Sequence, residues 1–402
     1  MGCVASATGK GCDRMKLRRF GPAPPADRDF HAEYLLQQKL GAGGFASVYS
    51  ATRADDAGHE VAVKIADVRP ACDEGRGFAD SCQKVDAERV RLVLSEVHKM
   101  KSVAGLDHVC QIYDSFCSGG LSYIVIERCD RSLREALDSV PALNEETLRP
   151  FLKGMLRGLS FVHIWGVVHR DVKPDNFMCT GPGNAVKLCD FGLATSLAAE
   201  SSLGCTGQYG TPPYMAPEML QDTPYGAKVD SWSFGVTAYV ICFGRFPYTP
   251  AKMTAMDMKA AIIRGEPAPT FRPRGGQRDR RGISVGMTSW IADLLNRNPS
   301  DRPTSVQALD SGFFRLPPPL KTSLRPMLHA AVRCGAFDDG GAVPSPVTEL
   351  DLRLRELQEQ HHPQFKSMDK AAAEPEACQH WSEVSTAFGS TSGGSLVRGV
   401  TA

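Results

Sequence analysis

One short stretch at residues 167–177, VVHRDVKPDNF, constrains this chain more than any other. Two valines lead into it, and it then gathers Arg170, Asp171, Lys173, Asp175 and Asn176. A solvated loop is the simplest interpretation, because charged and amide side chains favour water. The other interpretation is a site for phosphate and metal, since carboxylate and amide oxygens suit hard cations. The remaining motifs decide between the two.

The bulk composition indicates an ordinary globular chain. Its 402 residues are 42% hydrophobic and 23% charged, which allows one large two-lobed domain with tails or two ordinary domains. A formal net charge of +1 gives no general reason to expect nucleic-acid binding. Thirteen cysteines are scattered without a C-x-x-C pair, which disfavours a zinc knuckle. With no apolar run long enough for a membrane span, we expect a reduced, cytoplasmic location.

Composition and sequence pattern divide the chain into three predicted parts. Residues 1–33 read as a flexible arm, residues 34–315 as a folded domain, and residues 316–402 as a Pro/Ser/Gly-rich tail, mostly disordered, with one amphipathic helix at 349–360. Within the domain, alternating patterns predict strands at 34–53, 59–67, 109–116 and 121–127, a loop at 67–82, a helix at 84–103 and mostly helices after 133. Val90, Leu94 and Val97 are expected to lie on one face of the first helix.

Two segments before the opening stretch favour phosphate binding. LGAGGFASV places Gly41, Gly43 and Gly44 between two predicted strands, where a bare backbone can approach phosphate oxygens. The segment VAVK ends at Lys64. This lysine could bind the α- and β-phosphates if a carboxylate from a nearby helix holds its ammonium group in place. Glu96 on the predicted helix is the first candidate, and Glu88 competes because the intervening loop is long.

A further segment, KLCDFGLA, places an acid at the end of an apolar strand. Asp190 and Asn176 are expected to bind Mg²⁺, which takes one or two carboxylates together with substrate phosphates. Asp171 would then accept the proton of an incoming hydroxyl, and Lys173 would neutralise the transferred phosphoryl group. Asp175 needs no such role.

Glycine loop, VAVK, HRDVKPDN, DFG and MAPE occur here in one order. In that order and spacing, residues 34–315 resemble the eukaryotic protein kinase superfamily. The resemblance implies an α+β, two-lobe kinase fold with a β-rich N-lobe, one main helix in it, and a mostly helical C-lobe. It also implies ATP and Mg²⁺ as cofactors and protein substrates. Asp230 is then expected to brace the catalytic loop, and Arg302 to pair with Glu218.

The same resemblance implies further site residues. Lys173 and GTPPYMAPE are similar to the Ser/Thr type, with Thr211 expected to contact Asp171 and Lys173. The nucleotide pocket carries over by position onto Val48, Ala62, Met178, the hinge residues Glu127 and Cys129, and the gatekeeper Ile126. Cys189 is read as a buried thiol or as a target for covalent inhibitors. Two departures are Ala46, in place of the third glycine, and the long loop before Glu96.

Regulation is predicted at two places. Arg170 is expected to pair with a phosphate on the activation segment, with Thr206 as the first candidate and Ser201, Ser202 and Tyr209 as rivals.

The second regulatory expectation is at the start of the chain. MGCVAS fits a myristoylation motif at Gly2 with a palmitoylation site at Cys3, followed by a basic stretch, and so predicts a membrane surface. No EF-hand loop is present in the sequence. Two competing hypotheses are a catalytically silent, kinase-fold scaffold and a small-molecule kinase. Lys64, Asp171, Asn176 and Asp190 argue against the scaffold, and the peptide-type segment GTPPYMAPE argues against the small-molecule kinase.

Overall fold

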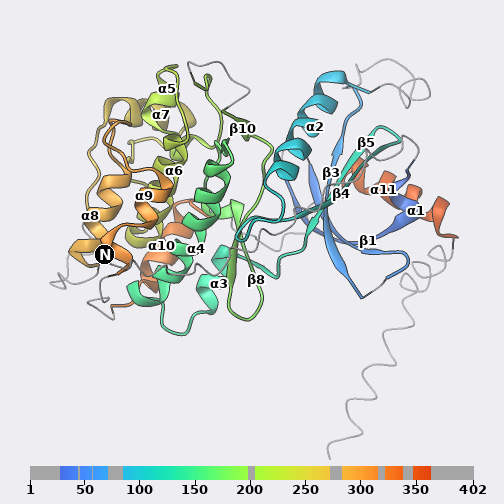
Figure 1. The fold of residues 1–402 in the computed structure, drawn as a ribbon, viewed down its shortest axis with the longest axis horizontal. Coiled ribbons are helices and arrows are strands. Elements are labelled where there is room, and N and C mark those ends of the chain that lie inside the picture. The colour runs from blue at the N-terminus through green and yellow to red at the C-terminus, as the bar shows by residue number, and fades with distance from the viewer. Residues whose placement is uncertain are drawn as a thin grey trace, which may run out of the picture.

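The computed structural model describes residues 28–43, 46–56, 58–70, 85–197, 204–271, 283–315, 322–337 and 347–363. They form two lobes, a small one built on a sheet and a large one built mostly from helices (Figure 1). This arrangement confirms the expected two-lobe α+β fold.

The small lobe is built on a five-stranded antiparallel sheet in the order β1-β2-β3-β5-β4. Its strands are β1 (Tyr34–Ala42), β2 (Ser47–Arg53), β3 (Glu60–Asp67), β4 (Ile112–Ser118) and β5 (Leu121–Glu127). Valine, isoleucine and tyrosine fill these segments and favour a pleated, half-buried surface. Short connections join most sequential strands, which explains the antiparallel pairing.

The register of this sheet assigns each side chain to one of two faces. Val48 lies opposite Lys64, which lies opposite Ile124, so these three share what we term the inner face. Tyr49 lies opposite Val63 on the outer face. The inner face therefore carries the residues expected to contact nucleotide.

Helix α2 (Ala87–Ser102) is capped at its N-terminus by Asp86, whose side chain accepts hydrogen bonds from two backbone amides of the first turn. Its buried residues are Glu96, Val97 and Met100, whereas Leu94 is 60% exposed. Leu94 lies on the same side of the helix as Val90 and Val97, as expected, but at the margin of the buried face. At about 100° per residue the buried face is centred between Glu96 and Val97, which puts Leu94 at its edge.

A second apolar cluster covers the outer face of the sheet. Phe30 is fully buried there, with its ring stacked 4.3 Å from that of Tyr123, and it belongs to the short helix α1 (Phe30–Glu33). Leu354 of α11 (Glu349–His361) is buried in the same cluster. Residues 30–33, which precede the predicted domain boundary at residue 34, therefore pack onto the small lobe.

Helix α11 confirms the helix expected near 349–360 and shows where it lies. Asp351 forms an ion pair with Lys39, and Gln358 exchanges two hydrogen bonds with the backbone of Leu36 at 3.0 and 3.1 Å. The tail helix therefore packs on the small lobe beside α1 (Figure 1).

The large lobe surrounds α6 (Lys228–Phe243), which is buried from Val229 onward. The other long helix is α4 (Glu145–Ile164), whose N-terminus is capped by Asn144. Around them lie α3 (Leu133–Ser139), α5 (Pro217–Leu220), α7 (Ala255–Arg264), α8 (Val285–Leu294) and α9 (Ser305–Leu309). Short strands at the cleft side are β6 (Arg131–Ser132), β7 (Val167–Val168), β8 (Phe177–Thr180), β9 (Ala185–Leu188) and β10 (Thr195–Ser196).

A helix missed by the sequence reading, α10 (Arg325–Arg333), extends the large lobe into the predicted tail. Leu324, Leu328 and Ala331 recur at four- and three-residue spacing and are buried, and the helix packs against α6. The nearby prolines favoured a linker, but Pro326 lies in the first turn, where its missing N–H costs nothing. The described part of residues 316–402 therefore belongs to the fold.

Candidate active site

The stretch at residues 167–177 is held in place by a buried carboxylate on α6. Asp230 is fully buried and accepts hydrogen bonds from the backbone N–H groups of His169 at 2.7 Å and Arg170 at 2.8 Å. Burial favours a neutral carboxyl, but a hydrogen bond from His163 and the nearby histidine charge lower the pKa of Asp230. The expected brace is confirmed, and it holds Arg170 at a left-handed φ of 67°.

Asp171 is fixed from two sides. Thr211 donates to Asp171 Oδ1 through its backbone N–H at 2.9 Å and its hydroxyl at 2.8 Å. Asn176 donates from Nδ2 to the carbonyl of Asp171 at 2.7 Å. Lys173 Nζ donates to the Thr211 hydroxyl at 3.0 Å and lies 3.3 Å from Asp171 Oδ2. The predicted contacts of Thr211 are therefore present.

A close backbone approach makes this arrangement depend on glycine. Gly210, just before Thr211, has a φ of +105°, and a Cβ there would lie 2.3 Å from the carbonyl oxygen of Arg170. Any other residue would push the activation segment away from the catalytic loop.

Lys64 on β3 lies between two carboxylates. Its Nζ is 2.7 Å from Glu96 Oε1 and 2.8 Å from Asp190 Oδ1. Glu88 is in the exposed first turn of α2, so Glu96 is the partner. Burial disfavours the ammonium charge, but the two carboxylates outweigh it and raise the pKa of Lys64. Lys64 therefore joins the sheet, α2 and the segment after β9.

Asp190 has the environment of a hard-cation ligand. Its backbone has a left-handed φ of 58°, and its side chain is 49% exposed although one oxygen meets Lys64. The charge of Lys64 lowers the pKa of Asp190 against the effect of burial. Asn176 directs its amide nitrogen at Asp171, which turns its oxygen the other way. A carboxylate and an amide oxygen fit Mg²⁺.

The residues predicted to bind the adenine ring come from the small-lobe sheet, the hinge and the large lobe. Val48, Ala62 and Ile126 share the inner face with Lys64, since Ala62 pairs with Ile126 and lies two residues from Lys64. Met178 is on β8 in the large lobe and is partly buried. Glu127 and Cys129 lie in the hinge, residues 127–130, which links β5 to β6.

The glycine loop is described in part. Gly41 lies one residue before the end of β1 and is exposed. Gly43 donates from its N–H to the carbonyl of Ala46 at 2.7 Å. Gly44 lies outside the described residues. The hairpin thus closes with Ala46 in place of the third glycine.

Arg170 of the catalytic loop contacts an aromatic ring of the activation segment. Its guanidinium is 4.0 Å from the ring centroid of Tyr209, and its Nε donates to the carbonyl of Leu193 at 2.7 Å. Thr206 is exposed, and its carbonyl accepts from the hydroxyl of Tyr225 at 3.2 Å. Ser201, Ser202, Gly2 and Cys3 lie outside the described residues.

At the end of this segment, Arg302 donates to both carboxylate oxygens of Glu218 at 2.6 and 3.1 Å, and its side chain is fully buried. Such bidentate pairs fix geometry as well as charge. The predicted pair of Arg302 with Glu218 is confirmed.

Two histidines of the site were missed by the sequence reading. His163, at the end of α4, donates from Nε2 to Asp230 Oδ2 at 2.8 Å, and His169 Nε2 lies 2.9 Å from the carbonyl oxygen of Cys189. His169 stands inside the HRD stretch, so a signal was available there. His163 follows an ordinary helical pattern, and no signal in the sequence distinguishes it.

Comparison with known proteins agrees with this geometry. A family model described as a protein kinase domain matches residues 34–314. A calcium/calmodulin-dependent serine/threonine-protein kinase 1 of Oryza sativa subsp. japonica is 29% identical over 76% of this chain and 48% of its own length. Serine/threonine-protein kinase sid1 of Schizosaccharomyces pombe is 32% identical over 70% of this chain and 54% of its own.

A third relative matches more of both chains. Serine/threonine-protein kinase ULK3 of Xenopus laevis is 26% identical over 90% of this chain and 71% of its own. The chain spans about half the length of the first two relatives. With the matched family model covering most of the sequence, the chain belongs to the eukaryotic protein kinase superfamily and is similar to its serine/threonine-type members.

Proposed function

We propose that the protein transfers the γ-phosphate of ATP to serine or threonine hydroxyls of protein substrates. One observation carries this proposal. Lys64 bridges Glu96 and Asp190 while Asp171 is held by Thr211, so the phosphate-facing cation and the hydroxyl-facing base are both in position. Phosphoryl transfer depends mostly on positioning and charge, and these contacts supply both.

The mechanism follows from the contacts. Asp171 orients the substrate hydroxyl and accepts its proton, because its carboxylate is fixed at the tip of the catalytic loop. Lys173 holds its ammonium beside that carboxylate, where it stabilises charge on the transferred group. Bound Mg²⁺ supplies positive charge that offsets the phosphate oxygens, and Asn176 and Asp190 would hold it.

Serine/threonine specificity is supported by one local network. Lys173, Thr211 and Asp171 are linked in a closed set of contacts of 2.8 to 3.3 Å, which is the contact of Thr211 expected for the serine/threonine type. A peptide-array assay that yields mainly phosphotyrosine would contradict this part of the proposal.

The test is transfer from radiolabelled ATP with Mg²⁺ to a generic serine/threonine protein, comparing wild type with Asp171→Ala. We expect transfer in wild type and its loss in the variant, with ATP binding retained in both. The alternative is a catalytically silent scaffold. Binding of ATP without any transfer, persisting after the activation segment is phosphorylated, would favour that alternative.

Activation by phosphorylation of Thr206 is the second part of the proposal. Thr206 is exposed, and Arg170 is the cation expected to pair with a phosphate on it. In this structure the guanidinium of Arg170 lies against the ring of Tyr209. We expect Thr206→Ala to remain poorly active after treatment with an activating kinase, whereas Tyr209→Phe responds. Active enzyme found unmodified at Thr206 by mass spectrometry would refute this part.

Tethering to a cytoplasmic membrane surface is the third part. It rests on Gly2, Cys3 and the basic stretch that follows them, because one acyl chain anchors weakly and a second signal is needed. None of the described helices is long and apolar enough to cross a membrane. Equal partitioning of wild type and Gly2→Ala into the soluble fraction would contradict the tether.

A further inference from the structure

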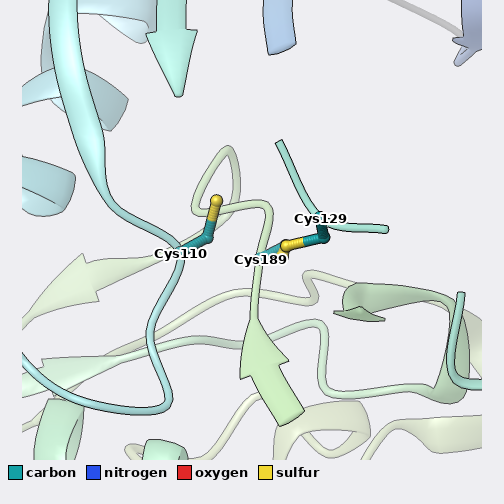
Figure 2. A group of neighbouring side chains, drawn as sticks. All are labelled: Cys110, Cys129 and Cys189. Atoms are coloured by element: carbon teal, nitrogen blue, oxygen red, sulfur yellow. The ribbon is translucent and has the colours of Figure 1, made fainter. Parts of the chain in front are cut away.

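Three cysteines that are far apart in the sequence meet beside the hinge. Cys110 precedes β4, Cys129 lies in the hinge, and Cys189 follows β9 immediately before Asp190. Their sulfur atoms all lie within 4.8 Å of one another (Figure 2). The sequence disfavoured a zinc knuckle because no C-x-x-C pair is present, but a metal site needs proximity in space and not in sequence.

The backbone around these sulfurs holds all three segments in place. Cys110 donates from its N–H to the carbonyl of Leu188 at 2.9 Å, and Cys189 donates from its N–H to Asn176 at 2.9 Å. The side chain of Lys187, beside Cys189 in the chain, pairs with Glu127 in the hinge at 3.1 Å. The cluster is therefore built on hydrogen-bonded, ordered backbone.

We propose that Cys110, Cys129 and Cys189, which we term the thiol cluster, bind one thiophilic divalent metal ion such as Zn²⁺. Zinc holds thiolates at about 2.3 Å in a tetrahedron, which places sulfurs about 3.8 Å apart. The three sulfur atoms lie within 4.8 Å of one another, so a small rotation of the side chains would bring them to that distance. Three protein thiolates leave one coordination position for water or an external ligand.

Metal binding to the thiol cluster requires deprotonated sulfur. On binding, each thiol that still carries a proton releases it to solvent and the sulfur lone pair forms the metal bond. The proposal itself rests on the placement of the sulfur atoms.

The test measures metal and does not depend on phosphoryl transfer, so it stands apart from the proposed function. The reduced full chain is titrated with Zn²⁺ alone against a chromogenic chelator, and with Co²⁺ to detect thiolate-to-metal charge transfer. We expect one ion per chain, and a loss of affinity of at least about 10-fold in Cys129→Ser and in Cys189→Ser. Cys117→Ser, which changes an exposed cysteine on β4, is the matched control.

A second measurement needs no variant and so is not affected by misfolding. Alkylation of wild-type protein, mapped by mass spectrometry, should be slowed by Zn²⁺ at Cys129 and Cys189 but not at Cys117. Absence of binding would overturn the proposal and leave the cluster as packed thiols. Binding that is unchanged in both cluster variants, or protection confined to other cysteines of the chain, would overturn it as well.

Discussion

Two lysine–carboxylate pairs lie on opposite faces of the small-lobe sheet. On the inner face Lys64 meets Glu96 and Asp190, and on the outer face Lys39 meets Asp351 at 3.0 Å. Lys39 pairs across the sheet with Tyr49, and Lys64 with Val48, which is why the two ammonium groups point in opposite directions.

The two pairs differ in how fully their carboxylates are satisfied. Asp351 accepts from Lys39, the hydroxyl of Tyr49, and both the backbone N–H and the hydroxyl of Thr348. The side chain of Asp190 is 49% exposed, and only its Oδ1 accepts the hydrogen bonds from Lys64 and from the N–H of Gly192. A saturated carboxylate can only hold structure, whereas one with an exposed oxygen can take a ligand. Similar pairs thus serve attachment on one face and chemistry on the other.

The largest effect should come from the inner pair. Lys64→Met removes the cation between two carboxylates, and we expect phosphoryl transfer to fall about 10³-fold because charge on the phosphates is no longer offset. Lys39→Met, the matched change on the outer face, should keep transfer within about twofold. Initial rates with radiolabelled ATP measure both. Equal losses in the two variants would remove the distinction between the faces.

The next effect concerns the apolar contact of α11. Leu354→Ala should weaken docking of this helix by about 2–3 kcal/mol, because Leu354 is 3% exposed in the outer cluster. Hydrogen exchange along residues 349–361 and β1 should become faster. Leu352→Ala, at a position 53% exposed on the same helix, is the control and should leave exchange unchanged. Equal exchange in the two variants would mean that α11 is held by its polar contacts.

A smaller effect is expected from the outer ion pair. Asp351→Ala removes the acceptor shared by Lys39, Tyr49 and the first turn of α11, and should cost about 2 kcal/mol. Denaturant unfolding monitored on the small lobe would measure this cost. Glu356→Ala, at an exposed position of the same helix, should cost almost nothing. A loss of transfer as large as that of Lys64→Met would contradict a purely structural role.

The smallest effect is a pH response of the outer face. Burial lowers the pKa of His31 from 6.5 to about 4, with Asp29 opposing and His361 and His362 reinforcing this shift. Because the folded pKa lies below the unfolded one, the stabilisation is complete above pH 6.5 and is lost as the pH falls toward 4. Between pH 7.5 and 5.5 the loss should be about 1 kcal/mol.

This pH response is measured by unfolding at several pH values. His31→Gln should flatten the dependence, and His59→Gln, which changes an exposed histidine of the small lobe, should preserve it. A dependence that survives in His31→Gln would assign the response to other groups.

The catalytic residues were largely predictable from the sequence, and the outer face of the sheet was not. Catalysis requires specific residue types at fixed spacing, so Lys64, Asp171, Asn176 and Asp190 stand in recognisable motifs. Their choice of partner was harder, because only the fold shows that Glu96 and not Glu88 reaches Lys64. On the outer face, Lys39 and Asp351 are separated by 312 residues and carry no motif. Packing of Phe30 and Leu354 depends on shape, which many apolar residues could supply.

Because α10 packs on the large lobe and α11 on the small one, the hinge is not the sole covalent connection between the lobes. From Phe337 to Val347 the chain has ten Cα–Cα steps, which reach at most about 35 Å. A swing of the lobes that carries these two residues farther apart must first detach a helix, so the range of cleft opening is coupled to the strength of a contact on the far side of the sheet.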